Sequence, residues 1–169
     1  SDGKDGDHYE NEDKPETRSF TWREAIKERS FWLLSTGHSL SLLAVSSMLA
    51  HLIPHLTNSL NYSLRDASIA FSLMTGLQLI GIFLGGYLGD KYNKKKLVVF
   101  CMLGHFLGLM AIAFASNPYW VVAFAILHGI AWGIRGPLMV ALRADYFGSK
   151  FFGTIMGFSS LIVMIGMTF

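Results

Sequence analysis

Five long apolar runs, almost free of charged residues, constrain this 169-residue chain more than any other feature. Nine of its twelve acidic residues precede Ser30, and the other three are Asp66, Asp90 and Asp145. A helix rises about 1.5 Å per residue, so roughly 20 residues cross a hydrocarbon core about 30 Å thick. The runs therefore predict five membrane spans, near residues 31–53, 67–88, 97–115, 118–142 and 151–169.

The spans are predicted to be helices that pack into one bundle. Their apolar residues are continuous and do not alternate, which favours helices over the strands of a membrane barrel. Hydrophobic residues make up 51% of the sequence, as expected for an all-α, polytopic transmembrane protein. Small residues four positions apart allow helix backbones to approach closely in lipid. Such pairs occur in four spans: Gly81, Gly85 and Gly89; Gly104 and Gly108; Gly129 and Gly133; Gly153 and Gly157.

The segments before the first span have a different composition. Residues 1–19 are acidic and nearly without apolar side chains, which predicts a disordered cytoplasmic linker. Thr21 and Glu24 have the spacing of a capping box, so we expect an amphipathic surface helix over residues 20–30. The sequence does not start with Met and stops inside an apolar run, so we also expect a fragment of a longer protein.

Lysine and arginine gather on one side of the predicted spans. Six precede Ser30, four lie between Lys91 and Lys96, and Arg143 and Lys150 lie between the last two spans. The other side holds only Arg65. By the positive-inside rule the N-terminal segment and the Lys-rich loop are cytoplasmic, in a plasma (inner) membrane.

The loop from Gly86 to Lys96, with Asp90, Lys91, Asn93, Lys94 and Lys95, resembles a signature of the major facilitator superfamily of secondary transporters. That signature reads Gly-x-x-x-Asp-Arg/Lys-x-Gly-Arg/Lys-Arg/Lys and joins two helices. The resemblance covers about residues 18–169. It implies helices seven to eleven of a twelve-helix fold, with the N-terminal half as partner. Asn93 replaces the usual Gly, and we expect it to adopt the left-handed turn conformation.

Four shorter segments are similar to the oxalate/formate antiporter and monocarboxylate porter branch of that family. They are Phe20–Ala25, Phe31–Leu34, Arg143–Gly148 and Phe152–Gly157. This similarity implies small organic anions, such as mono- or dicarboxylates, as substrates.

Arg135 is a charged residue within the fourth span and marks a candidate substrate site. A cation at a helix centre costs about 2.5 to 3.5 kcal/mol even on the mild insertion scale, so it needs a partner or a watery cavity. At 100° per residue, His128, Trp132, Arg135 and Met139 share one helix face, and Gly136-Pro137 predicts a bend. Two interpretations stay open: Arg135 binds an anion, or it reaches the headgroups or Asp145.

Polar residues in other spans are secondary candidates. Thr75 and Gln78 continue a stripe with Ser68 and Ser72 that lines the same cavity, although hydroxyls also bond their own helix. His38, His105 and His128 lie within spans, where each either relays protons or packs as a hydrogen-bonded residue. The final list of predicted substrate-binding residues is Arg135, Trp132, His128, Gln78 and Thr75.

Other chemistries lack a sequence signal. His51 and His55 have the spacing of a metal pair, but Pro54 intervenes and no third ligand follows, so we expect no metal. The sequence contains neither a phosphate-binding loop nor the spacing of a catalytic triad. We therefore expect no enzyme activity, no cofactor and no nucleic-acid binding. The sequence favours secondary transport of a small solute by alternating access. The alternative is a non-transporting membrane sensor or scaffold on the same bundle, and an intramembrane enzyme is third.

The predicted orientation can be tested by labelling. Cysteines introduced at Asn93 and Ser149 in a background without Cys101 should resist an impermeant maleimide in intact cells, because both sites are cytoplasmic. They should react after the membrane is permeabilised. Labelling of either site from outside contradicts the five-span orientation.

Overall fold

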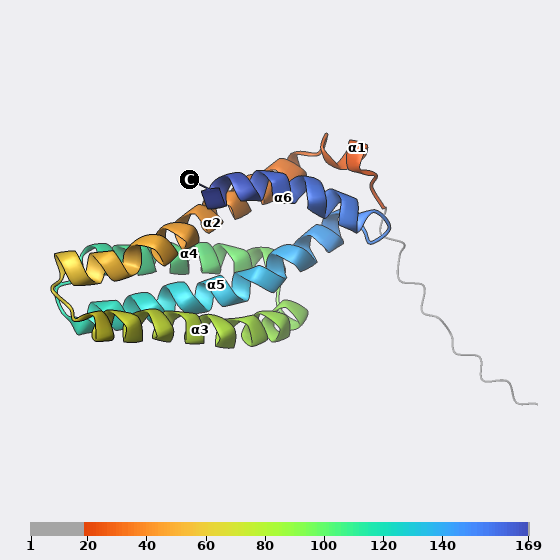
Figure 1. Cartoon of the computed structure of the whole chain (residues 1–169). Helices are drawn as coiled ribbons and strands as arrows, with labels where there is room; N and C mark the ends of the chain where they lie inside the picture. The colour runs from red at the N-terminus through yellow and green to blue at the C-terminus, as the bar shows by residue number, and fades with distance from the viewer. Residues whose placement is uncertain (1–18, 169) are drawn as a thin grey trace, which may run out of the picture.

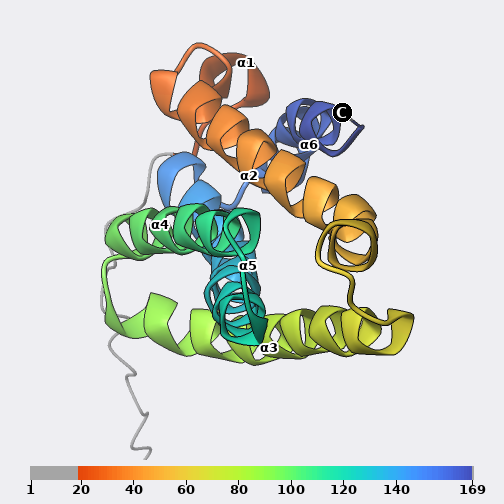
Figure 2. The same ribbon diagram turned by 90° about the vertical axis from the view of Figure 1, so that its left-hand side faces the viewer.

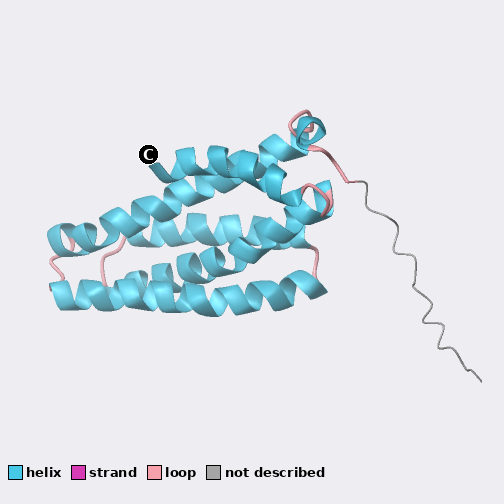
Figure 3. Ribbon diagram, turned by 45° about the vertical axis from the view of Figure 1, so that its right-hand side comes forward, coloured by secondary structure: helices cyan, strands magenta, loops and turns pink. Residues whose placement is uncertain are grey.

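The structure is a computed structural model that describes residues 19–168, and these residues contain helices and loops but no strand (Figure 3). The acidic segment 1–19 therefore lies outside the described residues, except for Ser19. The observed elements confirm the predicted all-α fold. They are α1 (Trp22–Ala25), α2 (Arg29–Pro54), the π-helical turn η1 (His55–Ser59), α3 (Leu64–Lys91), α4 (Lys94–Ala113), α5 (Pro118–Phe147) and α6 (Phe152–Thr168).

Four helices are long and apolar enough to cross a membrane, among the residues described: α2 with η1, α3, α4 and α5. The fifth predicted span corresponds to α6, which is apolar but shorter. Large apolar side chains cover the outside of the bundle, with Phe83 72% exposed and Phe100 69% exposed. A protein with this surface is an integral, multi-pass membrane protein, because exposed apolar side chains over spanning helices are stable in lipid and not in water.

Most helix boundaries follow from local capping. Ser63 and Asn117 accept backbone N–H groups at the starts of α3 and α5, and α5 ends at Gly148, whose φ of 76° suits glycine. Asn93 corrects one expectation: its φ is −64°, and it is not left-handed. Its side chain instead caps α4 by accepting from the N–H groups of Lys95 and Lys96, so an Asn serves here as a helix start.

The first helix is shorter than the predicted 20–30 segment. Thr21 and Glu24 form the expected capping box, but α1 is a single turn and α2 begins at Arg29. The chain turns between them because Ala25 and Phe31 both bury in one cluster with Phe147 and Ile155. The Trp32 indole closes this turn by donating to the carbonyl of Ile26 at 2.8 Å.

The cluster of Ala25, Phe31, Phe147 and Ile155 joins all four segments that resemble the organic-anion branch. Phe147, at the end of α5, makes edge contacts with Phe20 and Phe31 at centroid distances of 5.9 and 6.2 Å. The backbone N–H of Phe20 donates to the carbonyl of Phe147 at 3.0 Å. Sequence segments more than a hundred residues apart thus build one packing unit, where α1, α2, α5 and α6 meet.

Helix α5 is central, with α3 and α4 packed against it and α2 paired with α6 (Figure 2). Glycines bring α3 and α5 into backbone contact, as the four-residue spacing predicted. A Cβ added at Gly133 would lie 2.1 Å from the carbonyl oxygen of Gln78, and one at Gly81 would lie 2.6 Å from that of Ile130. On α4, Gly104 and Gly108 give similar access to α5, whereas Gly153 and Gly157 have nothing within 4 Å in the described chain.

The basic segments share one end of the bundle. Figure 1 places α1, the α3–α4 turn and the α5–α6 turn together at one end, and the α2–α3 and α4–α5 turns at the other. This arrangement agrees with the up-and-down order of the predicted spans. Helix α5 continues through Pro137, and in Figure 1 its second half rises away from α3 toward α6.

Enlarging Gly133 tests the α3–α5 contact. Gly133→Ala should force the two backbones apart and destabilise the bundle by about 1 to 3 kcal/mol or more, because a filled contact cannot absorb a methyl group. The matched control is Gly76→Ala, since a Cβ there meets nothing within 4 Å. Thermal unfolding of both variants in detergent measures the difference, and equal midpoints contradict the contact.

Candidate functional site

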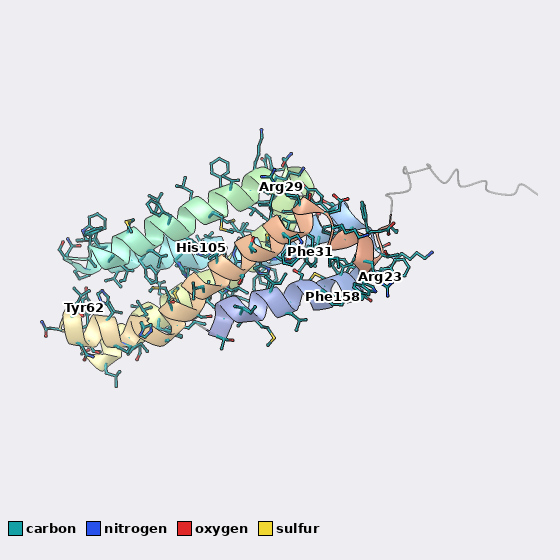
Figure 4. The ribbon with its side chains drawn as sticks, turned by 90° about the horizontal axis from the view of Figure 1, so that it is seen from above. Arg23, Arg29, Phe31, Tyr62, His105 and Phe158 are labelled. Atoms are coloured by element: carbon teal, nitrogen blue, oxygen red, sulfur yellow. The ribbon has the colours of Figure 1, made fainter. Side chains whose placement is uncertain are left out.

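Arg135 is buried at the junction of α4 and α5. Its side chain is 1% exposed, and its Nε donates to Nε2 of His105 at 3.4 Å. Figure 4 places His105 midway along the bundle, with Tyr62 near one end and Arg29 near the other. The side chain therefore points into the bundle and not toward the headgroups.

A second imidazole extends this contact. Nδ1 of His105 lies 3.2 Å from Nδ1 of His128, and the two rings meet nearly edge-on with centroids 4.6 Å apart. His128 is fully buried and stacks on Phe124 at 5.3 Å. The predicted site residues Arg135 and His128 are thus joined through His105, a histidine for which the sequence left proton relay or hydrogen-bonded packing open.

Among the described residues, two buried side-chain atoms have no hydrogen-bond partner: Nη1 of Arg135 and Nε2 of His128. A buried donor without an acceptor is costly and is normally satisfied. Among the described residues, no Asp or Glu lies between the ends of any spanning helix, since Asp66 and Asp90 sit in terminal turns and Asp145 near the end of α5. The site therefore carries positive charge with no internal counter-ion in this part of the chain.

Asp145 is the counter-ion of a different base. Its Oδ2 lies 2.7 Å from Nζ of Lys94, so it pairs with the Lys-rich loop and not with Arg135. Lys95 adds a cation–π contact to the ring of Tyr146 at 4.8 Å. The loop is anchored by these two residues to the end of α5.

Arg143 is a second buried arginine, and here the sequence prediction was wrong. The apolar runs predict Arg143 in the loop between the last two spans, but it lies inside α5 and is 2% exposed. Its Nη2 bonds to Nδ1 of His38 on α2 at 3.1 Å, and its Nη1 donates to the carbonyl of Met139 at 3.3 Å. The missed signal is that no Gly or Pro lies between Pro137 and Gly148.

The remaining predicted lining residues lie apart from the hydrogen-bonded side chains of Arg135, His105 and His128. Trp132 is half-buried against the core cluster around Phe124, and the Thr75 hydroxyl donates to carbonyls of its own helix at 3.1 Å. Gln78 is half-buried on α3, where its backbone carbonyl oxygen lies against Gly133 of α5. No hydrogen bond joins Trp132, Thr75 or Gln78 to Arg135 in the described structure.

The loop signature divides between packing and exposed positions. Gly86 has nothing within 4 Å, whereas at Gly89 an added Cβ would lie 2.8 Å from Leu138. Asp90 is exposed and makes no contact with a base in the described part, while Lys91 lies over the ring of Tyr87. Residues 19–168 hold no cluster of three or more metal-binding side chains.

Comparisons with known proteins agree on one family. The family model of the Major Facilitator Superfamily matches residues 9–169. A bacillibactin exporter of Bacillus subtilis is 30% identical over 107 residues, which are 60% of this chain and 27% of the exporter. A gallate transporter of Pseudomonas putida is 35% identical over 77 residues, which are 46% of this chain and 17% of that protein.

A niacin transporter of Acinetobacter baylyi is 34% identical over 71 residues, 42% of this chain and 16% of its own length. The chain thus spans about a quarter or less of the length of these relatives. No solved structure matches it. All three of these relatives are named as transporters or exporters.

The loop anchor can be tested with a double-mutant cycle. Lys94→Gln and Asp145→Asn should each reduce stability by less than about 1 kcal/mol, because both side chains are partly exposed and solvent screens their pairing. Their coupling should be about 0.2 to 1 kcal/mol. Replacing Lys94→Gln by Lys96→Gln in the cycle should give additive effects, and zero coupling for both pairs contradicts the contact.

Proposed function

The chain belongs to the Major Facilitator Superfamily, and from that premise we propose that it forms helices seven to eleven of a secondary transporter for a small organic anion. The transporter works by alternating access, in which this bundle rocks against the N-terminal half. The lipid bilayer, that N-terminal half and the substrate are its partners. The names of the relatives support transport in general.

The buried, unpaired Nη1 of Arg135 carries this proposal. An arginine inside a membrane bundle faces a partner or a substrate path, because its charge is costly in hydrocarbon. The described helices supply an imidazole to its Nε but no anion to its charge. A carboxylate accepts two parallel N–H groups of a guanidinium and neutralises it in the same contact.

The substrate class rests on the same chemistry. Small mono- or dicarboxylates match a single arginine with no opposing acid, and they agree with the resemblance to the oxalate/formate and monocarboxylate branch. The named relatives for gallate and niacin act on compounds whose acid forms carry one carboxyl group. Because Arg135 is 1% exposed here, the substrate reaches it when the bundle opens during the transport cycle.

Other residues complete the proposed site. His128 shares the buried chain with Arg135, while Trp132, Thr75 and Gln78 line the path by which the anion approaches. Gln78 is the strongest of the three, since its half-buried amide has no hydrogen-bond partner in the described structure. The basic loop, with Asp90 and Lys91, faces the cytoplasm at the plasma (inner) membrane.

Removing the charge of Arg135 tests the function. Arg135→Gln should lower anion uptake by at least about 30-fold, because truncating one partner of a buried charge pair costs about 2 kcal/mol or more. Uptake of labelled formate, oxalate, gallate and nicotinate by the full-length protein in liposomes measures this loss. Arg65→Gln is the matched control, since Arg65 is exposed at the other end of the bundle.

A folded Arg135→Gln protein that carries these anions at the wild-type rate contradicts the proposal. Intact uptake together with lost signalling to a partner protein would favour the sensor. Stability of the variant is checked by the same thermal unfolding used for Gly133.

A further inference from the structure

The buried chain of Arg135, His105 and His128 has a defined hydrogen-bond direction. Arginine only donates, so Nε2 of His105 must accept the Nε–H group of Arg135. A neutral His105 then carries its proton on Nδ1 and donates to Nδ1 of His128. His128 in turn carries its proton on Nε2, which is the atom left without a partner.

An added proton does not fit this arrangement. Two rings with three protons place one proton in the Nδ1–Nδ1 bond and one on each Nε2 atom. The Nε2–H group of His105 then points at the Nε–H group of Arg135, so two donors and two positive charges face each other. Protonation of the imidazole pair therefore breaks its contact with Arg135 and frees Nε, in addition to Nη1, which has no partner.

We propose that the His105–His128 pair binds a proton that is carried together with the anion held by Arg135. This inference rests on the proposed function. The empty state holds Arg135 on a neutral imidazole. The loaded state holds one proton on the pair and the carboxylate on the guanidinium of Arg135. No other bond forms or breaks, and a proton with a monoanion leaves the net charge of the buried site unchanged.

The surroundings leave the imidazole pair as the available proton acceptor. From α2 comes His38, which is bonded to Arg143, and from α4 comes Cys101; both lie within electrostatic reach of Arg135. Helix α5 adds only the two arginines and His128 to the interior. The ionisable groups of α3 are exposed near its ends, and α6 has none in its described residues. Without a buried carboxylate, an imidazole is the group that can take up a proton near neutral pH.

The proton requirement can be measured with an imposed pH gradient. Liposomes containing the full-length protein receive the four labelled anions at equal pH or with the outside one unit more acid. We expect the wild type to accumulate the monoanions about tenfold in the gradient, because one proton enters with each. Protein-free liposomes give the passive diffusion of each neutral acid, which is subtracted.

Glutamine variants separate the proton from the anion. The double variant His105→Gln/His128→Gln keeps a side-chain acceptor toward Arg135 but has no imidazole of the pair left to bind a proton, so it should exchange anion for anion and lose the tenfold accumulation. His51→Gln is the matched control, because His51 is exposed near the other end of α2. Gradient-driven accumulation in the double variant overturns the inference.

The two proposals fail in different ways. Anion exchange in the wild type with no response to the pH gradient overturns the proton site and leaves the anion transporter intact. Absence of transport for all four anions, or unchanged transport in Arg135→Gln, overturns the proposed function, and the proton inference with it.

Discussion

The backbone contact between α3 and α5 is the constraint on which the rest of the bundle depends. In lipid, apolar burial does not drive helices together, so association requires close van der Waals contact between backbones. Gly81 and Gly133 allow that contact, and it commits one face of α5 to α3. The neighbouring face, which carries His128 and Arg135, is then turned to α4, where Gly104 and Gly108 flank His105.

The second constraint is electrostatic. The described interior of the bundle contains two arginines and three histidines but no carboxylate. Buried cations usually pair with an acid or line a path for an anion. Here each arginine contacts one imidazole: Arg135 with His105, and Arg143 with His38. Each imidazole accepts a hydrogen bond without cancelling the charge, so positive potential is retained in the middle of the helices.

The sequence predicted what depends on single helices. Apolar runs located the spans, glycine spacing identified helix faces suited to close packing, and Thr21 with Glu24 identified the capping box. The prediction failed at Asn93, because Asn suits both a left-handed turn and a helix N-cap. In the structure it caps α4 and does not adopt a left-handed turn. Hydropathy alone ended the fourth span before Arg143, because a charged residue lowers the score even when a neighbouring helix supplies its partner.

The site was predicted only in part, for a geometric reason. The periodicity of α5 placed His128 and Arg135 on one face, but no periodicity within α5 states which residue of another helix meets that face. That partner depends on the rotation of α4, and the clue was the position of His105 between the two glycines of α4. Thr75 and Gln78 show the same limit, since a polar stripe on α3 does not define the distance to α5.

The choice of imidazole over carboxylate as the partner of Arg135 has a functional consequence. A buried carboxylate would neutralise the guanidinium permanently, and an incoming anion would have to displace a charged, hydrogen-bonded pair. A neutral imidazole at 3.4 Å satisfies only one N–H group and leaves the charge uncompensated. In the proposed transporter, an anion would displace only this single weak contact, and the released imidazole would be free to hold a proton. Such a site stays charged when empty, and neutral histidines let this bundle tolerate that charge.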